Sequence, residues 1–284
     1  MVREFKLLNE NGQEFSLMDI ENYCLLTDPS GLGITYKTEY EQLGNTFVEN
    51  IRRIEKEQID GLVNFTNYDN YRSLINFIES SEQLQIAYQI PYESGEREFL
   101  KDIQIQSITK TQRQLNGIIS ESIVFDCLSL WYEKNTIIYT IEPATNEIRW
   151  NFEWDSRFAD YNSRSMEYIN EGHTEAPILV EINGHVSNPG IELYVEGQLY
   201  QTVSFNIEIA EYEKLLYGTQ ENNFYIKKQN ADGTLEDLYN LSVIDFNNDN
   251  VIRIPKNKSC ELRLIADTDI LNAQVTILAY YKAV

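Results

Sequence analysis

GIISESIVFDCLSLWYE, the stretch from Gly117 to Glu133, decides the fold of the first half of the chain. Apolar and polar residues alternate along it, so one face of a strand carries the side chains of Ile119, Ile123, Phe125 and Cys127. Such alternation is typical of an antiparallel sheet with one face packed on a core. We therefore predict a core strand, and we predict that the first domain ends at the tryptophan and tyrosine that close the stretch.

Cys127 is the residue of this stretch that could carry chemistry. A nucleophilic cysteine needs a neighbouring base or cation that lowers its pKa. Its place on the apolar face predicts a buried structural thiol instead. The three cysteines, Cys24, Cys127 and Cys260, are far apart and form no CxxC motif. Free thiols of a protein made in a reducing cytoplasm are therefore expected rather than disulfides.

The composition favours a folded β protein with an acidic surface. Of the 284 residues, 42% are hydrophobic and 19 are tyrosines, which suit pleated, half-buried surfaces. The chain has 45 acidic and 23 basic residues and a formal net charge of -22. Such a surface repels phosphate backbones, so specific nucleic-acid binding is not expected. The charge indicates either an ordinary solvated surface or an acidic wall past which DNA slides without sticking.

Targeting and membrane segments are not predicted. The N-terminal sequence MVREFKLLNENGQEF is mixed and charged, without the apolar stretch of a signal peptide. No run approaches the roughly 18 apolar residues of a membrane span. We expect a protein that is made and folded inside a cell and does not insert into a membrane.

One helix is predicted, in the segment TNYDNYRSLINFIESSEQ, residues 66–83. Asn67 or Asp69 can cap its N-terminus. Apolar residues at spacings of three and four give it one apolar face, formed by Tyr71, Leu74, Ile75 and Ile78. The strand LQIAYQIPY follows directly. In the next strand, residues 99–108, the alternation breaks at Ile108, which indicates a bulge or the end of the strand.

The segment between residues 30 and 60 has a different character. Its apolar residues are scattered, it has no helical stripe, and it carries many charges. This pattern predicts an extended arm or a long hairpin that packs against something outside its own domain. A mobile loop is the alternative.

The second half of the chain predicts an antiparallel sandwich. Residues 133–177 are a transition with one strand, IRWNFEW, and from Pro177 onward short strands alternate with Gly, Pro and Asn turns. Asp232-Gly233 marks the tip of a hairpin. In LYQTVSFNIEI the alternation predicts a shared inward face for Leu199, Val203, Phe205, Ile207 and Ile209.

No catalytic, cofactor or metal site is predicted. The two histidines, His173 and His185, and the isolated cysteines lack the spacing of zinc ligands. Carboxylates are plentiful, so a glycosidase-type pair on a sandwich stays open as an alternative; no calcium, nucleotide or hydrolase motif is present. Trp131, Trp150 and Trp154 could stack on sugar rings, although the alternation in WNFEW favours core positions.

Four stretches occur in an informative order: YDNYRSLINFIESSEQLQIAYQI, GIISESIVFDCLSLWY, APILVEINGHVSNPGIELYVEG, and DGTLEDLYN followed by IRIPKNKSCELRLIAD. Together they resemble the distal tail proteins of long, non-contractile-tailed phages that infect Gram-positive bacteria. The stretches span nearly the whole chain, and the ordered set is more specific than any one of its members.

The resemblance implies a mainly β fold in two domains. Residues 1–132 would form a split β-barrel-like ring domain with one α-helix and an arm or β-hairpin at about 30–60. Residues 133–284 would form a galectin-like or carbohydrate-module-like sandwich. The arm would embrace the neighbouring subunit, with the interface candidates Tyr36, Tyr40, Phe47, Ile51, Ile54 and Ile59. Deleting residues 38–58 is then expected to abolish ring formation and to leave the sandwich folded.

The resemblance also implies a structural, non-enzymatic virion protein of a siphovirus or prophage. A homohexameric ring would sit at the tail tip, between the major tail tube protein and the tail-associated tip protein. It would carry receptor-binding or baseplate proteins while DNA passes through its channel, and it would be assembled in the host cytoplasm. The alternative function is a carbohydrate-binding module that contacts the host cell wall.

Overall fold

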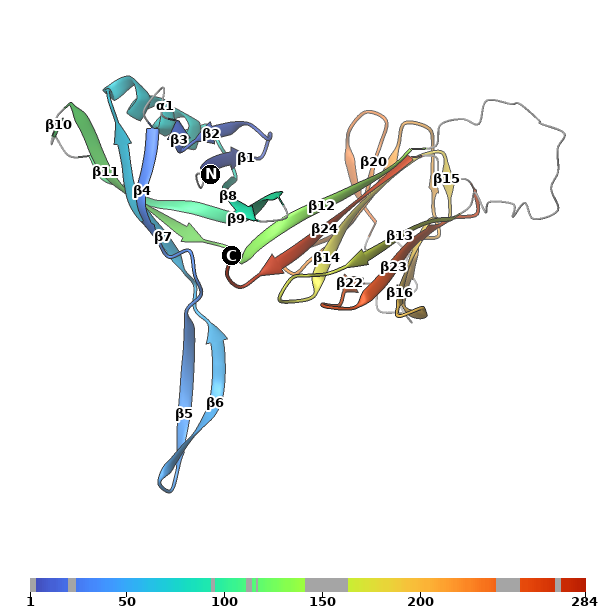
Figure 1. The fold of residues 1–284 in the computed structure, drawn as a ribbon. Coiled ribbons are helices and arrows are strands. Elements are labelled where there is room, and N and C mark those ends of the chain that lie inside the picture. Colours follow the sequence, from blue (N-terminus) through green and yellow to red (C-terminus); the bar gives the residue numbers. More distant parts are fainter. Residues whose placement is uncertain are drawn as a thin grey trace. The chain divides into compact units, whose positions relative to one another are not determined.

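The computed structural model describes residues 4–19, 24–92, 95–110, 114–115, 117–140, 163–238, 251–268 and 272–284. The chain forms two compact units, Met1–Glu133 with Tyr281–Val284, and Lys134–Tyr280. Antiparallel strand pairs dominate both units, and the described residues contain a single α-helix (Figure 1). The predicted mainly β class is confirmed.

The first unit is a sheet with one helix on it. Its elements are β1 (Glu4–Asn9), β2 (Glu14–Ser16), β3 (Met18–Asp19), β4 (Cys24–Ser30), β5 (Tyr36–Leu43), β6 (Thr46–Ile54), β7 (Gln58–Phe65), α1 (Tyr68–Glu79), β8 (Leu84–Tyr92), β9 (Gly95–Ile108), β10 (Gln114–Leu115), β11 (Ile118–Cys127) and the start of β12 (Trp131–Thr140). Strands β12, β9, β11, β7, β4 and β3 are neighbours in that order. Strand β8 pairs with β9 and β1, and β2 pairs with β1.

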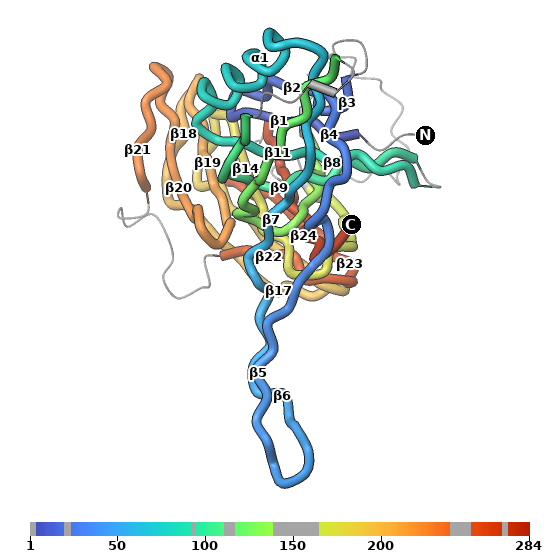
Figure 2. Tube along the Cα trace, turned by 90° about the vertical axis from the view of Figure 1, so that its left-hand side faces the viewer, coloured from blue at the N-terminus to red at the C-terminus, as the bar shows by residue number. Residues whose placement is uncertain are grey.

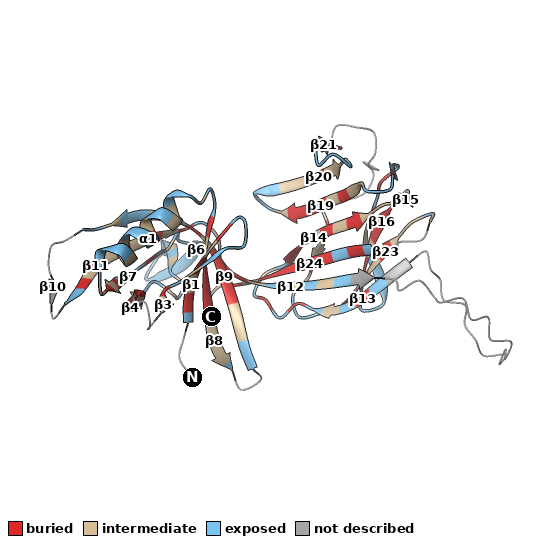
Figure 3. Cartoon of the chain, turned by 90° about the horizontal axis from the view of Figure 1, so that it is seen from above, coloured by how far each residue is buried: buried red, intermediate tan, exposed pale blue. Residues whose placement is uncertain are grey.

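β11 is the predicted core strand, and its alternating burial confirms the predicted apolar face (Figure 3). The alternation also places Glu121, 1% exposed, on the buried face. β11 lies between β7 and β9. The β9–β11 register shifts between Val124 and Phe125, which is the irregularity predicted from the phase of Ile108.

α1 begins after Asn67, whose side chain accepts a hydrogen bond from the backbone N–H of Asn70 at 2.9 Å. Of the two predicted caps, Asn67 is therefore the one that the helix uses. On the apolar face Leu74 is fully buried, and the ring of Tyr71 meets Phe65 of β7 edge-on. The helix thus covers part of the core beside β7.

The second unit is a sandwich of two antiparallel sheets. Its elements are the rest of β12, β13 (Ser163–Ile169), β14 (Ala176–Asn183), β15 (Val186–Ser187), β16 (Gly190–Val195), β17 (Gln198–Ser204), β18 (Glu208–Ile209), β19 (Lys214–Gln220), β20 (Asn223–Gln229), β21 (Leu235–Asp237), β22 (Arg253–Ile254), β23 (Ser259–Ile265) and β24 (Asn272–Tyr281). One sheet has the order β21-β20-β19-β14-β24-β12, and the other has the order β13-β23-β16-β17. The hairpin predicted at Asp232-Gly233 connects β20 and β21.

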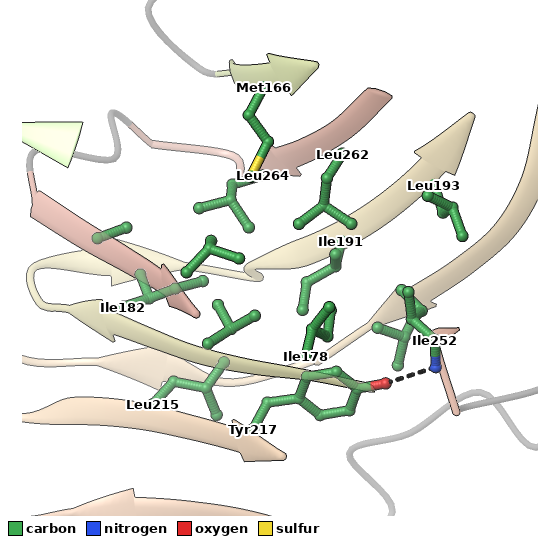
Figure 4. Packing of buried hydrophobic residues seen from close by; sticks show 14 of the residues in the cluster. Met166, Ile178, Ile182, Ile191, Leu193, Leu215, Tyr217, Ile252, Leu262 and Leu264 are labelled. Atoms are coloured by element: carbon green, nitrogen blue, oxygen red, sulfur yellow. Dashed lines mark hydrogen bonds between the residues drawn. The ribbon is translucent and has the colours of Figure 1, made fainter. Parts of the chain in front are cut away.

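The core of the second unit lies between these sheets (Figure 4). Val180 of β14 lies opposite Val275 of β24 on one side and Tyr217 of β19 on the other, and all three side chains are buried. The Tyr217 hydroxyl accepts a hydrogen bond from the backbone N–H of Ile252 at 3.0 Å, which satisfies a buried polar group. This is the antiparallel sandwich predicted for the second half of the chain.

Leu199 departs from the predicted inward face of β17. The β16–β17 register shifts, so that Leu193 lies opposite Gln201 but Tyr194 lies opposite Leu199. Leu199 is therefore turned to the outer side and is 53% exposed, whereas Val203 is buried as predicted. A bulge reverses the direction of side chains beyond it, and the apolar pattern does not reveal its position.

The last residues, Tyr281–Val284, group with the first unit, whereas the sequence predicted a second domain that runs to residue 284. Arg97 Nη2 donates to the Tyr281 hydroxyl at 2.8 Å, and the ring of Tyr281 meets Phe99 edge-on. These contacts belong to the first unit. The chain therefore leaves that unit within β12 and returns to it at the end of β24.

Candidate functional site

The arm is formed by β5 and β6, which pair with each other and with no other described strand, and which extend beyond the β4–β7 pair (Figures 1 and 2). Gly44 and Asn45 make the two-residue turn between them. Gly44, with φ of 62°, supplies the positive φ that a type II′ hairpin turn needs at its first central position. The segment predicted as an extended arm or a long hairpin is thus a long hairpin and not a loop. The Gly44-Asn45 dipeptide, which was not used in the prediction, could have located the turn at its tip.

Cross-strand pairing gives the arm two faces, because residues directly opposite each other project on the same side. The tyrosine face comprises Tyr36, Thr38, Tyr40, Gln42, Phe47, Glu49, Arg52 and Ile54. The valine face comprises Lys37, Glu39, Glu41, Leu43, Thr46, Val48, Ile51 and Arg53. A bulge leaves Asn50 without a cross-strand partner, and it places Phe47 on the tyrosine face and Val48 on the valine face.

Apolar side chains are exposed on both faces of the arm. Tyr40 and Phe47 are 62% and 69% exposed on the tyrosine face. Leu43 and Val48 are 56% and 48% exposed on the valine face. A lone two-stranded hairpin is marginally stable at best in water, and contiguous exposed apolar surface marks interaction sites. The arm therefore has the chemistry of a docking element.

Four of the six predicted interface residues share the tyrosine face: Tyr36, Tyr40, Phe47 and Ile54. Ile51 is half-buried on the valine face. Ile59 is fully buried in β7, in the core of its own unit, so its prediction as an interface residue is wrong. Sequence reasoning missed Leu43 and Val48, because the bulge that sets the two faces leaves no mark in the apolar pattern.

A buried ion pair ties the root of the arm to the first unit. Lys101 of β9 is 1% exposed, and its Nζ donates to Glu57 Oε2 at 3.2 Å. The other carboxylate oxygen, Glu57 Oε1, accepts the backbone N–H of Thr35 at 2.6 Å. Thr35 precedes β5 and Glu57 follows β6, so one carboxylate joins both ends of the arm to the core.

Trp131 forms a second connection at the same root. Its Nε1 donates to the carbonyl oxygen of Leu32 at 3.2 Å, and Lys101 Nζ lies 4.9 Å from the centre of its ring. Gly31, with φ of 78°, lies so close to β7 that a Cβ there would be 1.8 Å from the carbonyl oxygen of Gln58. Only glycine fits at this position. The path of the chain into the arm is thus fixed by packing as well as by charge.

The predicted sugar-stacking tryptophans do not form a platform in the part of the chain that the structure describes. Trp131 is 0% exposed and has no ring face to offer, so its prediction as a glycan contact is wrong. Trp150 and Trp154 lie outside the described residues.

The three cysteines are free and buried. Burial raises the pKa of the Cys24 thiol to about 12. Burial also raises the pKa of the Cys127 thiol, against the opposing influence of Lys101. A raised pKa keeps a thiol protonated and weakly reactive at neutral pH. The burial predicted for Cys127 from the alternation is confirmed.

Replacing Cys127 by alanine is expected to lower the free energy of unfolding by about 1 kcal/mol, because a small buried group is lost and no charge is left behind. Self-association of the chain is expected to stay unchanged. Urea denaturation measures the first effect, and molar mass from light scattering measures the second. A variant that folds normally but associates less than the wild type would show that the thiol takes part in assembly.

Other candidate chemistry is sparse in the described ranges. No group of three or more potential metal ligands occurs among the described residues. His185 Nε2 lies 3.3 Å from Glu208 Oε1, in a pair whose side chains are both exposed. No helix in the described part of the chain is long and apolar enough to cross a membrane.

Residues 4–128 match the family model of the distal tail protein, N-terminal domain. This part of the chain is therefore similar to the N-terminal domain of distal tail proteins. The match includes the arm, the Lys101–Glu57 pair at its root and α1. The distal tail protein of Lactococcus phage SK1 is 28% identical over 148 residues, which are 49% of the chain and 48% of that relative. The similarity thus spans about half the length of the curated relative.

Solved structures extend the likeness in fold to the whole chain. A chain of the phage P2 baseplate in its activated conformation has a TM-score of 0.68 at 18% identity and covers 100% of both chains. The Dit protein of phage SPP1, a hub adsorption apparatus of phages that infect Gram-positive bacteria, has a TM-score of 0.55 at 11% identity, over 96% of this chain and 98% of the other. The resemblance to distal tail proteins is therefore confirmed by the family model over residues 4–128, and the solved structures show a shared fold over the whole chain.

Proposed function

We propose that this chain is a structural hub of a phage tail tip, in which six copies form a ring through their N-terminal domains. The arm carries the proposal, because a distal tail protein N-terminal domain here extends a hairpin whose two faces expose apolar side chains. A head-to-tail ring gives every arm the same surface of a neighbouring copy, and a closed ring leaves no arm uncovered. The ring therefore accounts for both the arm and its exposed residues.

The proposed ring joins the major tail tube protein to the tail-associated tip protein, and it holds receptor-binding or baseplate proteins. DNA passes through its channel without specific binding. The formal charge of -22 per copy supports this role, because acidic surfaces repel the phosphate backbone. The copies assemble in the cytoplasm of the host and act in the tail tip of the virion, and their role is structural rather than catalytic. The carbohydrate-binding alternative has no comparable support, since Trp131 is buried.

The purified chain is expected to form rings whose molar mass is six times its 33.2 kDa, since each arm gains cover only from another copy. Light scattering over a range of protein concentrations measures the mass, and negative-stain images count the copies in each ring. A chain that stays monomeric at every concentration would contradict the proposal. A closed ring with another number of copies would contradict the hexamer and keep the role of the arm.

A further inference from the structure

The larger sheet of the second unit has an outer face, turned away from the core, that is formally neutral. Strands β21, β20, β19, β14 and β24 are neighbours in this sheet (Figure 3), and their outward residues lie between residues that are buried in the core. The charged residues on the outward side of these strands are Glu181, Lys214, Lys227 and Asp237, so the formal charges cancel. Lys214 Nζ donates to Glu181 Oε1 at 2.6 Å, and Lys227 lies directly opposite Asp237. In a chain of net charge -22, this face therefore selects neither a cationic nor an anionic partner.

The same face carries six amide side chains, none of which forms a hydrogen bond with another residue in the described ranges. They are Asn183, Gln220, Asn223, Gln229, Asn272 and Gln274. The buried Asn170 differs, because its Nδ2 donates to the carbonyl oxygens of Thr174 and Ile254. An amide offers both donors and an acceptor, which is the chemistry that neutral hydroxyl groups require of a binding site.

The aromatic ring on this face is that of Tyr225, which leans across the neighbouring strand β19. Tyr225 lies directly opposite Gly218 in the β19–β20 register. A Cβ at Gly218 would lie 2.5 Å from Cε1 and 2.6 Å from Cζ of the tyrosine, so a side chain there would displace the ring. The ring therefore lies along the sheet rather than projecting from it, and Tyr225 is half-buried, so part of its surface stays open to a ligand.

The outer face thus has an apolar centre with a polar border. Leu179 lies opposite Gly218, Leu216 lies opposite Lys227, and both leucines are half-buried. An apolar protein segment docked here would bury the amides without partners, which is unfavourable. A sugar ring suits the face better, because its C–H groups pack on an aromatic surface while its hydroxyl groups bond to amides.

We propose that the outer face of β14, β19, β20 and β24 binds a neutral saccharide. Tyr225 contacts the C–H groups of one sugar ring, and Gln220 and Asn223, which lie directly opposite each other beside it, bond to the hydroxyl groups. The inference goes beyond the proposed hub and does not depend on the ring of six copies. It is also separate from the predicted tryptophan contacts. Saccharide binding would give each copy in a tail tip its own contact with a cell surface.

The test measures binding of the full chain to an array of neutral oligosaccharides built from glucose, galactose, rhamnose and N-acetylglucosamine. Isothermal titration calorimetry then gives the dissociation constant for the oligosaccharide that binds most tightly. Tyr225→Ala is expected to raise this constant roughly tenfold, because the stacking surface is lost. Tyr225→Phe keeps the ring and should bind nearly as the wild type does. Added salt should have little effect, because the ligand is uncharged.

The double variant Gln220→Leu with Asn223→Leu separates a saccharide from a protein segment. It keeps Tyr225 and makes the face more apolar. Saccharide binding should weaken at least as much as in Tyr225→Ala, since two groups that bond to hydroxyls are lost. A matched control is Tyr200→Ala, which removes a tyrosine that is 59% exposed on β17, in the other sheet, and is expected to bind normally. Thermal unfolding verifies that every variant is folded.

Three results would overturn the inference. The first is a wild type that binds none of the neutral oligosaccharides at millimolar concentrations. The second is unchanged saccharide binding in both Tyr225→Ala and the double variant, which would place the site elsewhere. The third is another tail protein that binds the wild type through this face and binds the double variant equally or more tightly. None of these results bears on the proposed ring, which is tested by the molar mass.

Discussion

A chain in which Glu39–Ile51 is replaced by the dipeptide Asn-Gly is expected to stay monomeric at concentrations at which the wild type forms rings. Thr38 and Arg52 are directly opposite in the β5–β6 register, so a two-residue turn closes the shortened hairpin without disturbing its root. The replacement removes the exposed Tyr40, Phe47 and Val48 together. Since these side chains are the proposed contact, their loss should abolish association rather than weaken it.

Light scattering measures the mass of the shortened chain, and circular dichroism with thermal unfolding verifies its fold. Both units are expected to unfold as in the wild type. The control applies the same Asn-Gly replacement to Asn230–Thr234, the loop between Gln229 and Leu235, which lie opposite each other in β20 and β21. That control should still form rings. Rings formed by the arm-shortened chain would remove the arm from the assembly mechanism.

The structure also shows that the deletion of residues 38–58, which the sequence alone suggests as a test of ring formation, removes more than the arm. Removing residues 38–58 takes away Glu57, whose carboxylate bonds to Lys101 and Thr35. It also removes Gln58, the first residue of β7. If that variant failed to associate, the result would have two inseparable causes: the loss of the arm and damage to the core of the first unit. The shorter replacement leaves both residues in place.

The parts of the fold that the sequence predicts are those in which one face stays buried over many residues. In α1 apolar residues recur at spacings of three and four, and in β11 they recur at every second position. Several residues follow each pattern, so a single exception does not hide it. The faces of the arm and the direction of Leu199 depend instead on bulges, which shift the register by one residue. At these two positions no particular residue type marks the bulge in the sequence. It becomes visible only when the partner strand is known.

The Lys101–Glu57 ion pair at the root of the arm was not predicted from the sequence, for a different reason. Lys101 shares the phase of Phe99 and Ile103 in β9, so periodicity alone places it on the buried face. A lysine on the buried face of a strand is unusual, because charged residues are rarely fully buried unless they are paired. Its partner, Glu57, is 44 positions away in the sequence and lies outside any regular element. A lysine in phase with a core face was the available signal that a distant carboxylate must exist.

Replacing Lys101 by alanine is expected to lower the free energy of unfolding of the first unit by about 3–5 kcal/mol, the usual range when one partner of a buried ion pair is removed. The Glu57 carboxylate stays buried without a cation, and the Trp131 ring loses the lysine chain beside it. Domains have total stabilities of about 5–15 kcal/mol, so the loss is a large share. Hydrogen exchange measures it in each unit separately, because two units need not unfold together.

The double variant Lys101→Met with Glu57→Gln tests whether charge is the cause. Both charges are gone, methionine still fills the space against Trp131, and the glutamine carbonyl oxygen still accepts the Thr35 N–H. We expect it to recover much of the stability lost in Lys101→Ala, since apolar replacements of buried pairs are often neutral, and to be more stable than the sum of the two single substitutions predicts. Purely additive losses would show that Lys101 acts by packing alone. If the double variant also associates as the wild type does, the acceptor for Thr35 rather than the ion pair holds the arm in place for docking.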